Sequence, residues 1–325
     1  MNGEAEMLSA GAVGEEPSLS LGPGDYPTPR AVPPFLIATR MGPRSLHKHW
    51  IEGASRGLFD VLLSCFDPAV VPEAGPGMTV EFRPGKKVEG YAGILRNHAD
   101  LLERYKYVCF LDEDILASAD LLAGCFRLAA AHDLKIAQPA LAWGSYFSFA
   151  VLLQQPQFLL RHVNFIEMMC PIFRHDVLQK IRPLYEIGLE SGIDLIWCNA
   201  VYEGARDFAV LDAFPVLHTE PIGGRSIDNG FADAQGYEDH IQDALRRFGL
   251  PRHRPACYDA LRLDGRRVSG RLGLAFASLS VFGALPRQPK RRTLVKCGVD
   301  MLMHQLFLGA CNAKPMTFLA EEKTG

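Results

Sequence analysis

The feature that most constrains the fold is an uninterrupted apolar run, residues 107–111 (Tyr-Val-Cys-Phe-Leu), which ends at the acidic triplet Asp112, Glu113 and Asp114. A strand that is apolar at every position is typical of the centre of a parallel sheet covered by helices on both faces. In such sheets the ligand crevice lies beyond the carboxyl ends of the strands. The triplet is therefore expected at a ligand site of an α/β protein.

The segments around this run support the same fold class. Short apolar runs alternate with stretches in which apolar residues recur at helical spacing, which is the strand–helix–strand signature of a parallel sheet. A Pro/Gly-rich stretch over residues 68–85 and a turn-rich stretch over 215–230 are expected to be loops. The expected strands cover residues 35–38, 59–65, 107–111, 135–138, 165–173 and 208–211, and the expected helices residues 47–57, 91–105, 119–132, 176–181 and 192–201.

Length and composition divide the chain into three parts. With 325 residues, of which 48% are hydrophobic and 22% charged, it can bury a substantial core. Residues 1–33 are rich in Gly, Pro, Glu and Ser and are predicted to be a flexible tail. Residues 34–240 form the α/β domain, and residues 241–325 are predicted to be a helical, increasingly basic extension.

Charge, cysteine usage and the N-terminus exclude some classes of function. A formal net charge of −3 gives no whole-protein reason to expect nucleic-acid binding. The eight cysteines are scattered and form no CxxC pair, which predicts packed, reduced thiols. No basic region followed by an apolar one opens the chain, and no stretch reaches the roughly 20 apolar residues that span a bilayer. We expect a cytoplasmic protein.

The acidic triplet suggests a metal site. Two carboxylates two residues apart in an extended segment lie on the same side, about 6–7 Å apart along the chain. Asp112 and Asp114 could thus hold Mg²⁺ or Mn²⁺, with diphosphate oxygens completing its coordination. Such a cation would neutralise charge on a departing nucleoside diphosphate. The alternative is an acidic turn that caps the following helix.

Five sequence blocks resemble a known family. They are Val-Cys-Phe-Leu-Asp-Glu-Asp-Ile (108–115), Leu-Lys-Ile-Ala-Gln-Pro-Ala-Leu (134–141), Phe-Ile-Glu-Met-Met-Cys-Pro-Ile-Phe (165–173), Gly-Ile-Asp-Leu (192–195) and Val-Leu-His (216–218). Their order resembles the domain of unknown function 707 family of plants and bacteria, which is grouped with GT-A glycosyltransferases. The likeness covers about residues 33–225. It implies a GT-A-like, Rossmann-type, mostly parallel sheet flanked by helices.

The resemblance also implies roles for individual residues. On the GT-A pattern Asp112 faces the nucleotide ribose or the metal, Asp114 ligates the metal, and His218 is a third ligand. Asp194, at the start of a helix, matches the base that deprotonates an acceptor hydroxyl, with Glu190 as the second candidate. A hydrogen-bonded loop histidine and a helix N-terminal charge are the respective alternatives.

Other candidates follow from position. Glu167 lies within an apolar run, where a carboxylate is costly unless it is paired or lines a pocket, and we favour a role on the acceptor side. Contacts to the nucleotide are expected after the first strand, after the second strand and ahead of the helix that leads into the acidic strand. The residues concerned are Thr39, Arg40, Arg44, Asp67 and Lys86.

Together these features predict an enzyme, a glycosyltransferase of the hexosyltransferase kind. It would move a sugar from a nucleotide-sugar donor to a carbohydrate or other hydroxyl acceptor. A binding protein of the same fold without turnover, and a metal-dependent phosphohydrolase or nucleotidyltransferase, are the alternatives. Two apolar stretches, residues 270–284 and 299–310, flank a basic cluster. They predict packing against the core or a sister subunit, with peripheral contact to a membrane surface as the alternative.

Overall fold

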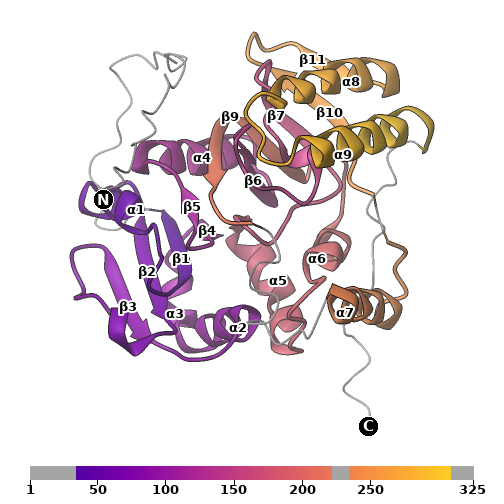
Figure 1. Cartoon of the computed structure of the whole chain (residues 1–325). Coiled ribbons are helices and arrows are strands. Elements are labelled where there is room, and N and C mark those ends of the chain that lie inside the picture. Colours follow the sequence, from indigo (N-terminus) through magenta and orange to yellow (C-terminus); the bar gives the residue numbers. More distant parts are fainter. Residues whose placement is uncertain (1–33, 222–233, 253, 309–325) are drawn as a thin grey trace, which may run out of the picture. The chain divides into compact units, whose positions relative to one another are not determined.

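The computed structural model describes residues 34–221, 234–252 and 254–308 (Figure 1). Residues 1–33, for which a tail was predicted, lie outside these ranges. The first half of the chain folds as strands alternating with helices: β1 (Phe35–Met41), α1 (Lys48–Ser55), β2 (Asp60–Cys65), β3 (Met78–Phe82), α2 (Lys87–Asn97), α3 (Ala99–Leu102), β4 (Tyr107–Phe110), β5 (Ile115–Leu116), α4 (Ala119–Ala131) and β6 (Ile136–Leu141).

The second half contributes β7 (Phe158–Val163), β8 (Ile172–Arg174), α5 (His175–Glu186), α6 (Asp194–Val201), β9 (Phe208–His218), α7 (Ala234–Arg247), β10 (Cys257–Arg262), β11 (Arg267–Ser269), α8 (Arg271–Ser278) and α9 (Arg291–Met303). Single turns of 3₁₀ helix lie at Pro68–Val70 and Ala150–Leu152. A longer 3₁₀ segment, η3 (Leu279–Ala284), follows α8, and a π-helical turn, η4 (His304–Leu308), follows α9.

One mixed sheet organises the domain. Its strand order is β11-β10-β7-β9-β6-β8-β4-β1-β2-β3, with β5 paired to β9 off this path. The pairings β1–β2, β2–β3, β1–β4 and β6–β9 are parallel. Along this order β8, β7 and β11 run opposite to the other strands, as does β5 beside β9. The predicted α/β fold with a mostly parallel sheet flanked by helices is therefore confirmed.

The core explains why β4 is apolar throughout. Tyr107, Phe110 and Leu111 are buried, and the ring of Phe110 stacks on Tyr91 of α2 at 4.3 Å. Tyr107 donates its hydroxyl to the carbonyls of Ala129 and Leu134 at the far end of the strand. A strand covered on both faces has no solvent side on which a polar residue would be retained.

Three expected elements differ from those observed. The strand predicted over 165–173 is instead an irregular segment, residues 164–171, between β7 and β8; it is apolar because it is buried, and not because it pairs as a strand. The stretch over 68–85 contains β3, and β9 runs on to His218. Short apolar runs do not by themselves distinguish strands from buried loops.

The C-terminal part also contains more than helices. Within residues 241–308, β10 and β11 form an antiparallel hairpin that joins the sheet beside β7. The hairpin and α8 enclose a small separate core of Phe158, Cys257, Ala260 and Leu274. This extension is thus built into the same sheet as the predicted α/β domain. Among the cysteines in the described ranges, all are free thiols and all but Cys297 are buried.

Candidate functional site

The candidate site lies at the carboxyl ends of β1, β4, β6 and β9. These strands share one direction, so the loop after Met41, the acidic triplet, the loop at 142–148 and His218 meet at the same edge. Because β8 runs the opposite way, the segment 164–171 that precedes it ends at this edge as well. The topology therefore gathers Glu167 and the triplet, which are far apart in sequence.

In the acidic triplet, Glu113 has a structural role, whereas Asp112 and Asp114 face the candidate site. Glu113 is buried, and its Oε2 accepts a hydrogen bond from the backbone N–H of Gly42 at 2.5 Å. The backbone N–H of Leu46 donates to the Glu113 carbonyl at 2.7 Å. Glu113 thus fastens the loop after β1 to the triplet. Ser118, rather than an aspartate of the triplet, caps α4. The alternative that the triplet serves as the cap of the following helix is therefore excluded.

Asp112 forms an ion pair that the sequence did not suggest. The ammonium of Lys87, the first residue of α2, lies 2.6 Å and 2.7 Å from its two carboxylate oxygens and donates to the carbonyl of Met168 at 3.0 Å. Burial raises the pKa of Asp112 to about 6, although the Lys87 charge opposes the rise. Lys87 therefore sits among the acidic groups as their counter-charge.

Asp114 faces His218 across the paired strands β5 and β9. The distance from Asp114 Oδ2 to His218 Nε2 is 3.4 Å. The other ring nitrogen, Nδ1, lies 3.0 Å from the carbonyl of Tyr146, so it carries the proton and donates. Burial alone would lower the pKa of His218, but the hydrogen bond and charge of Asp114 outweigh it and raise the value. When His218 is protonated, Nε2 donates to the Asp114 carboxylate; when His218 is neutral with Nδ1 bearing the proton, its Nε2 lone pair is free to ligate a cation beside Asp114.

These two groups suit a divalent cation, but they do not form a complete site. Neighbouring ligands of one small cation lie about 3 Å apart, close to the separation of Asp114 Oδ2 and His218 Nε2. Asp112, the third predicted ligand, points its oxygens at Lys87 instead. Within the described ranges no three His, Cys, Asp or Glu side chains are grouped closely enough to hold a metal ion. A cation there would need oxygens from a substrate or water.

Asp194 and Glu167 lie beside this group. Asp194 is the first residue of α6, and its Oδ2 accepts from the backbone N–H of Met168 at 3.4 Å. Burial raises the pKa of Asp194 to about 6, against hydrogen bonds from the backbone and the charge of Lys87. Burial also raises the pKa of Glu167 to about 7; a hydrogen bond with Ser148 opposes the rise and the charge of Asp194 adds to it. The pKa values of both carboxyls thus lie closer to neutral pH than those of ordinary carboxyl groups.

Glu167 is also fixed by the strand next to it. Its backbone N–H donates to Gln138 Oε1 of β6 at 2.7 Å. Within the described part of the chain, Glu167 Oε2 and Gln138 Nε2 are buried without a hydrogen-bond partner. Unsatisfied buried polar atoms are expected where a ligand or water completes a site. The acceptor-side role predicted for Glu167 is untested, and this pair of atoms is compatible with it.

Two of the predicted residues have scaffold roles instead. Glu190 accepts hydrogen bonds from the backbone N–H groups of Val88 and Glu89, at 3.1 Å and 3.0 Å, and so caps α2 from a distant loop. Its carboxylate is occupied there, which argues against Glu190 as a base. Lys86 is the exposed N-cap residue of α2, whereas Lys87, one position later, reaches the acidic groups. The sequence placed Lys86 ahead of this helix but expected the helix itself only from residue 91, so it did not single out Lys87.

Two of the five residues predicted to contact a nucleotide are internal. Thr39 and Arg40 are buried in β1, and Arg40 donates to Ser64 Oγ at 2.7 Å and to the Gly85 carbonyl at 3.0 Å. Asp67 accepts from the backbone N–H of Ala69 within its own turn. Arg44 is exposed, 3.7 Å from Glu220. Among these residues Arg44 carries an exposed guanidinium, and its partner Glu220 lies two positions after His218.

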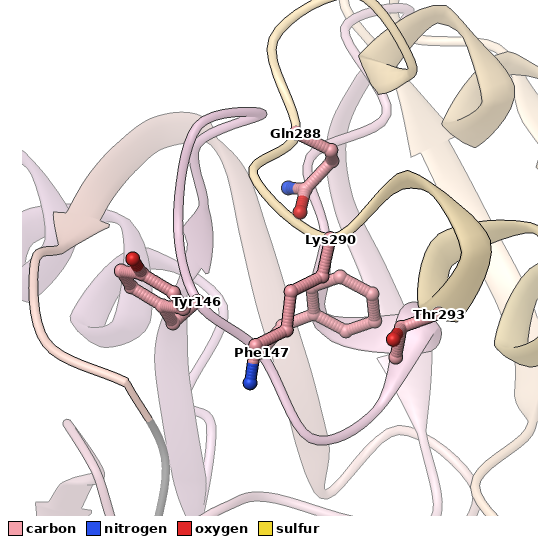
Figure 2. A pocket seen from close by; sticks show the side chains of 5 residues that line it. All are labelled: Tyr146, Phe147, Gln288, Lys290 and Thr293. Carbon is pink, nitrogen blue, oxygen red and sulfur yellow. The ribbon is translucent and has the colours of Figure 1, made fainter. Parts of the chain in front are cut away.

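A small hollow of about 20 Å³ lies beside the loop that orients the histidine. Figure 2 shows it between the loop that carries Tyr146 and Phe147 and the C-terminal segment that carries Gln288, Lys290 and Thr293. The Lys290 ammonium lies 5.8 Å from the centre of the Tyr146 ring. The same Tyr146 supplies the carbonyl that orients His218. The C-terminal segment thus supports the loop behind the site.

Comparisons with known proteins give a distant fold likeness. No protein-family model matches the sequence, and no curated protein matches it. Among solved structures, residues 1–349 of TarS from S. aureus match with a TM-score of 0.40 and 10% identity, over 85% of this chain and 90% of that one. A197 from STIV matches with a TM-score of 0.35 and 13% identity, over 72% and 93%.

The architecture described above is consistent with the GT-A-like α/β fold expected from the sequence. At these TM-scores, however, neither structure bears on the chemistry of the site. The resemblance to the domain of unknown function 707 family stays a prediction.

Proposed function

We propose that the protein is a glycosyltransferase that moves a sugar from a nucleoside diphosphate sugar to a hydroxyl acceptor. One observation carries the proposal. Lys87, Asp112, Asp114, Glu167, Asp194 and His218 come from five separate segments and meet at the carboxyl edge of the sheet, where the carboxyls of Asp112, Asp194 and Glu167 have raised pKa values. Perturbed carboxyls beside a candidate cation site are typical of catalytic groups.

Asp114, His218 and Lys87 would bind the diphosphate of the nucleotide-sugar donor. Asp114 and His218 are the residues that would hold Mn²⁺ or Mg²⁺, which supplies charge neutralisation for a departing diphosphate. The Lys87 ammonium has three donors, of which the carboxylate of Asp112 and the Met168 carbonyl take two or more. It would stabilise negative charge next to the cation. In this arrangement Asp112 orients Lys87. Asp112 would also contact the ribose of the nucleotide.

Asp194 is the proposed base. A carboxyl with a pKa of about 6 is ionised at neutral pH and still accepts a proton from an acceptor hydroxyl more readily than an ordinary aspartate. Its position at the start of α6 also favours the ionised form. Glu167, next to Asp194 and hydrogen-bonded with Ser148, would bind a second hydroxyl of the acceptor.

Calorimetry tests the donor side. Nucleoside diphosphates would be titrated into the full-length protein with and without Mn²⁺. We expect Mn²⁺-dependent binding of at least one of them, its loss in Asp114→Ala and in His218→Ala, and its retention in Asp100→Ala, a matched exposed acid in the first turn of α3. Absence of metal-dependent binding to any nucleotide would refute the proposal.

Product analysis then tests transfer. With the donor identified, Asp194→Asn should keep donor binding and lose transfer of the sugar to a hydroxyl acceptor. Loss of donor binding in Asp194→Asn would show that Asp194 is not the base. Release of free phosphate from the nucleotide, in place of sugar transfer, would favour a metal-dependent phosphohydrolase. Binding without turnover for any acceptor would favour a binding protein of this fold.

A further inference from the structure

Exposed large apolar side chains are concentrated in the C-terminal part of the structure. Twelve such side chains are exposed in the described ranges, and seven of them lie between residues 272 and 307. Phe276 is 71% exposed, Leu272 67% and Phe307 66%. Single exposed apolar residues are common, but a concentration of this kind marks an interaction surface. The seven residues, here called the C-terminal apolar surface, are Leu272, Phe276, Leu279, Val295, Val299, Met303 and Phe307.

Helical spacing aligns these residues on outward faces. Leu272, Phe276 and Leu279 are separated by four and three positions, so they share one face of α8 and the turn after it. Val295, Val299 and Met303 recur every four positions and share one face of α9. The turn η4, which carries Phe307, packs against both α8 and α9. Figure 1 shows α8 and α9 together at the yellow end of the chain.

The opposite faces of the same helices are buried, so the outward faces are held in place. Leu274 of α8 packs in the small core beneath the β10–β11 hairpin. Leu294, Gly298 and Met301 of α9 are buried, and a side chain at Gly298 would meet the ring of Phe282 at 2.8 Å. The helices therefore cannot roll to hide Phe276 or Val299 without breaking these contacts. The apolar surface is displayed by the fold.

Charge identifies what the surface would meet. Residues 271–307 contain six basic side chains, Arg271, Arg287, Lys290, Arg291, Arg292 and Lys296, and a single acidic one, Asp300. This segment is thus strongly basic within a chain whose formal net charge is −3. Arg292 and Lys296 are exposed and lie on the same outward side of α9 as Val295 and Val299. Apolar stripes edged by Arg and Lys are the signature of helices that lie in the interface of an anionic bilayer.

We propose that the C-terminal apolar surface binds the surface of membranes that contain anionic phospholipids. Phe276, Phe307 and Leu272 would insert among the acyl chains at the headgroup boundary, and Arg291, Arg292 and Lys296 would pair with lipid phosphates. In the part of the chain that the structure describes, none of the helices is both long and apolar enough to cross a bilayer, so the helices would lie along the surface. A second copy of the chain is a poorer occupant, because it would bring the same basic groups against this one. The inference is independent of the proposed transferase activity.

Vesicle co-sedimentation of the full-length protein tests this. Vesicles of phosphatidylcholine alone would be compared with vesicles that also contain phosphatidylglycerol, at low and high salt. We expect the protein to partition to the anionic vesicles and high salt to weaken the binding. Replacing Phe276 and Phe307 by Ser should lower partitioning by about 10-fold or more, from the loss of apolar burial. Arg291→Gln and Arg292→Gln should each lower it about fivefold.

Matched controls separate the surface from general effects. Phe82→Ser removes a phenylalanine that is 50% exposed on β3, and Arg96→Gln with Arg104→Gln removes two exposed charges from the α2–α3 region. Both controls should bind vesicles like the unaltered protein. Thermal unfolding of every variant checks that it folds.

Three results would overturn the proposal. The first is failure of the unaltered protein to sediment with anionic vesicles. The second is equal loss of binding in the controls. The third is a concentration-dependent dimer in sedimentation velocity that Phe276→Ser abolishes, without vesicle binding, since this would make the surface an interface between copies.

Discussion

Replacing Asp194 by Asn should stabilise the protein, and increasingly so as the pH rises. The pKa of Asp194 in the folded protein is about 6 against an ordinary 3.8, because burial disfavours the charged form. A group whose pKa is raised by folding contributes most to stability below its unfolded pKa, and this contribution is lost as the pH rises through the folded pKa. The loss amounts to about 3 kcal/mol at pH 8 and only about 0.5 kcal/mol at pH 4.

The Asn side chain removes this titration and keeps an oxygen that can accept from the N–H of Met168. The difference in unfolding free energy between Asp194→Asn and the unaltered protein should therefore grow by about 2 kcal/mol from pH 4 to pH 8. Urea unfolding followed by tryptophan fluorescence measures it, since Trp197 is buried in α6 itself. A difference that is independent of pH, or a variant less stable at pH 8, would refute the reasoning.

Asp176→Asn is the matched control for this prediction. Asp176 also lies in the first turn of a helix, but a hydrogen bond from Arg174 at 2.6 Å lowers its pKa. The sign is therefore opposite: its contribution is present above the unfolded pKa and is lost as the pH falls. Asp176→Asn should lose stability at pH 8 and lose little at low pH.

Three further predictions follow from the same contacts. Turnover, once a donor and acceptor are known, should rise with pH and be half-maximal near the pKa of Asp194, about 6; a rate that falls over this range in a pH–rate profile would contradict a general base. Arg161→Met should cost about 3–5 kcal/mol in urea unfolding, because it leaves Asp212 buried and unpaired, and adding Asp212→Leu should recover much of this loss; a silent Arg161→Met would contradict it. Gly90→Ala should cost about 1–3 kcal/mol by thermal unfolding, since its Cβ would lie 2.1 Å from Arg40 Nε; an unchanged melting temperature would show that Arg40 moves freely.

The sequence predicted those parts of the fold whose residue pattern is compatible with a single type of secondary structure. An apolar strand between two helices, followed by acidic residues, predicted β4 and the edge of the sheet at which the site lies. Apolar residues in a buried loop look the same as those in a strand, which is why 164–171 was misjudged. The β10–β11 hairpin was missed because its residues are only partly buried and several are charged.

The acidic residues and the histidine of the candidate site could be predicted from the sequence, but its lysine could not. Asp114, Asp194 and His218 could be named from their places relative to strands and helices, and the structure brings them to one edge. Lys87 could not, because the choice between Lys86 and Lys87 depends on where α2 begins to within one residue. Glu190 was misassigned because its capping of α2 is a contact across about a hundred positions of sequence, which no local pattern reveals.

The hydrogen bonds of Gln288 limit how far the chain can be truncated from its C-terminal side. Its Nε2 donates to the carbonyls of Trp143 and Ser145, and Ser145 Oγ in turn accepts from the backbone N–H of His218. Every proposed reacting group precedes residue 220, yet the loop that sets the histidine is fastened from the C-terminal segment. A fragment ending near residue 240 would carry all the chemistry and lack part of its frame. The smallest unit that can be moved intact into another protein therefore extends through α9, and does not stop at the first three quarters of the chain.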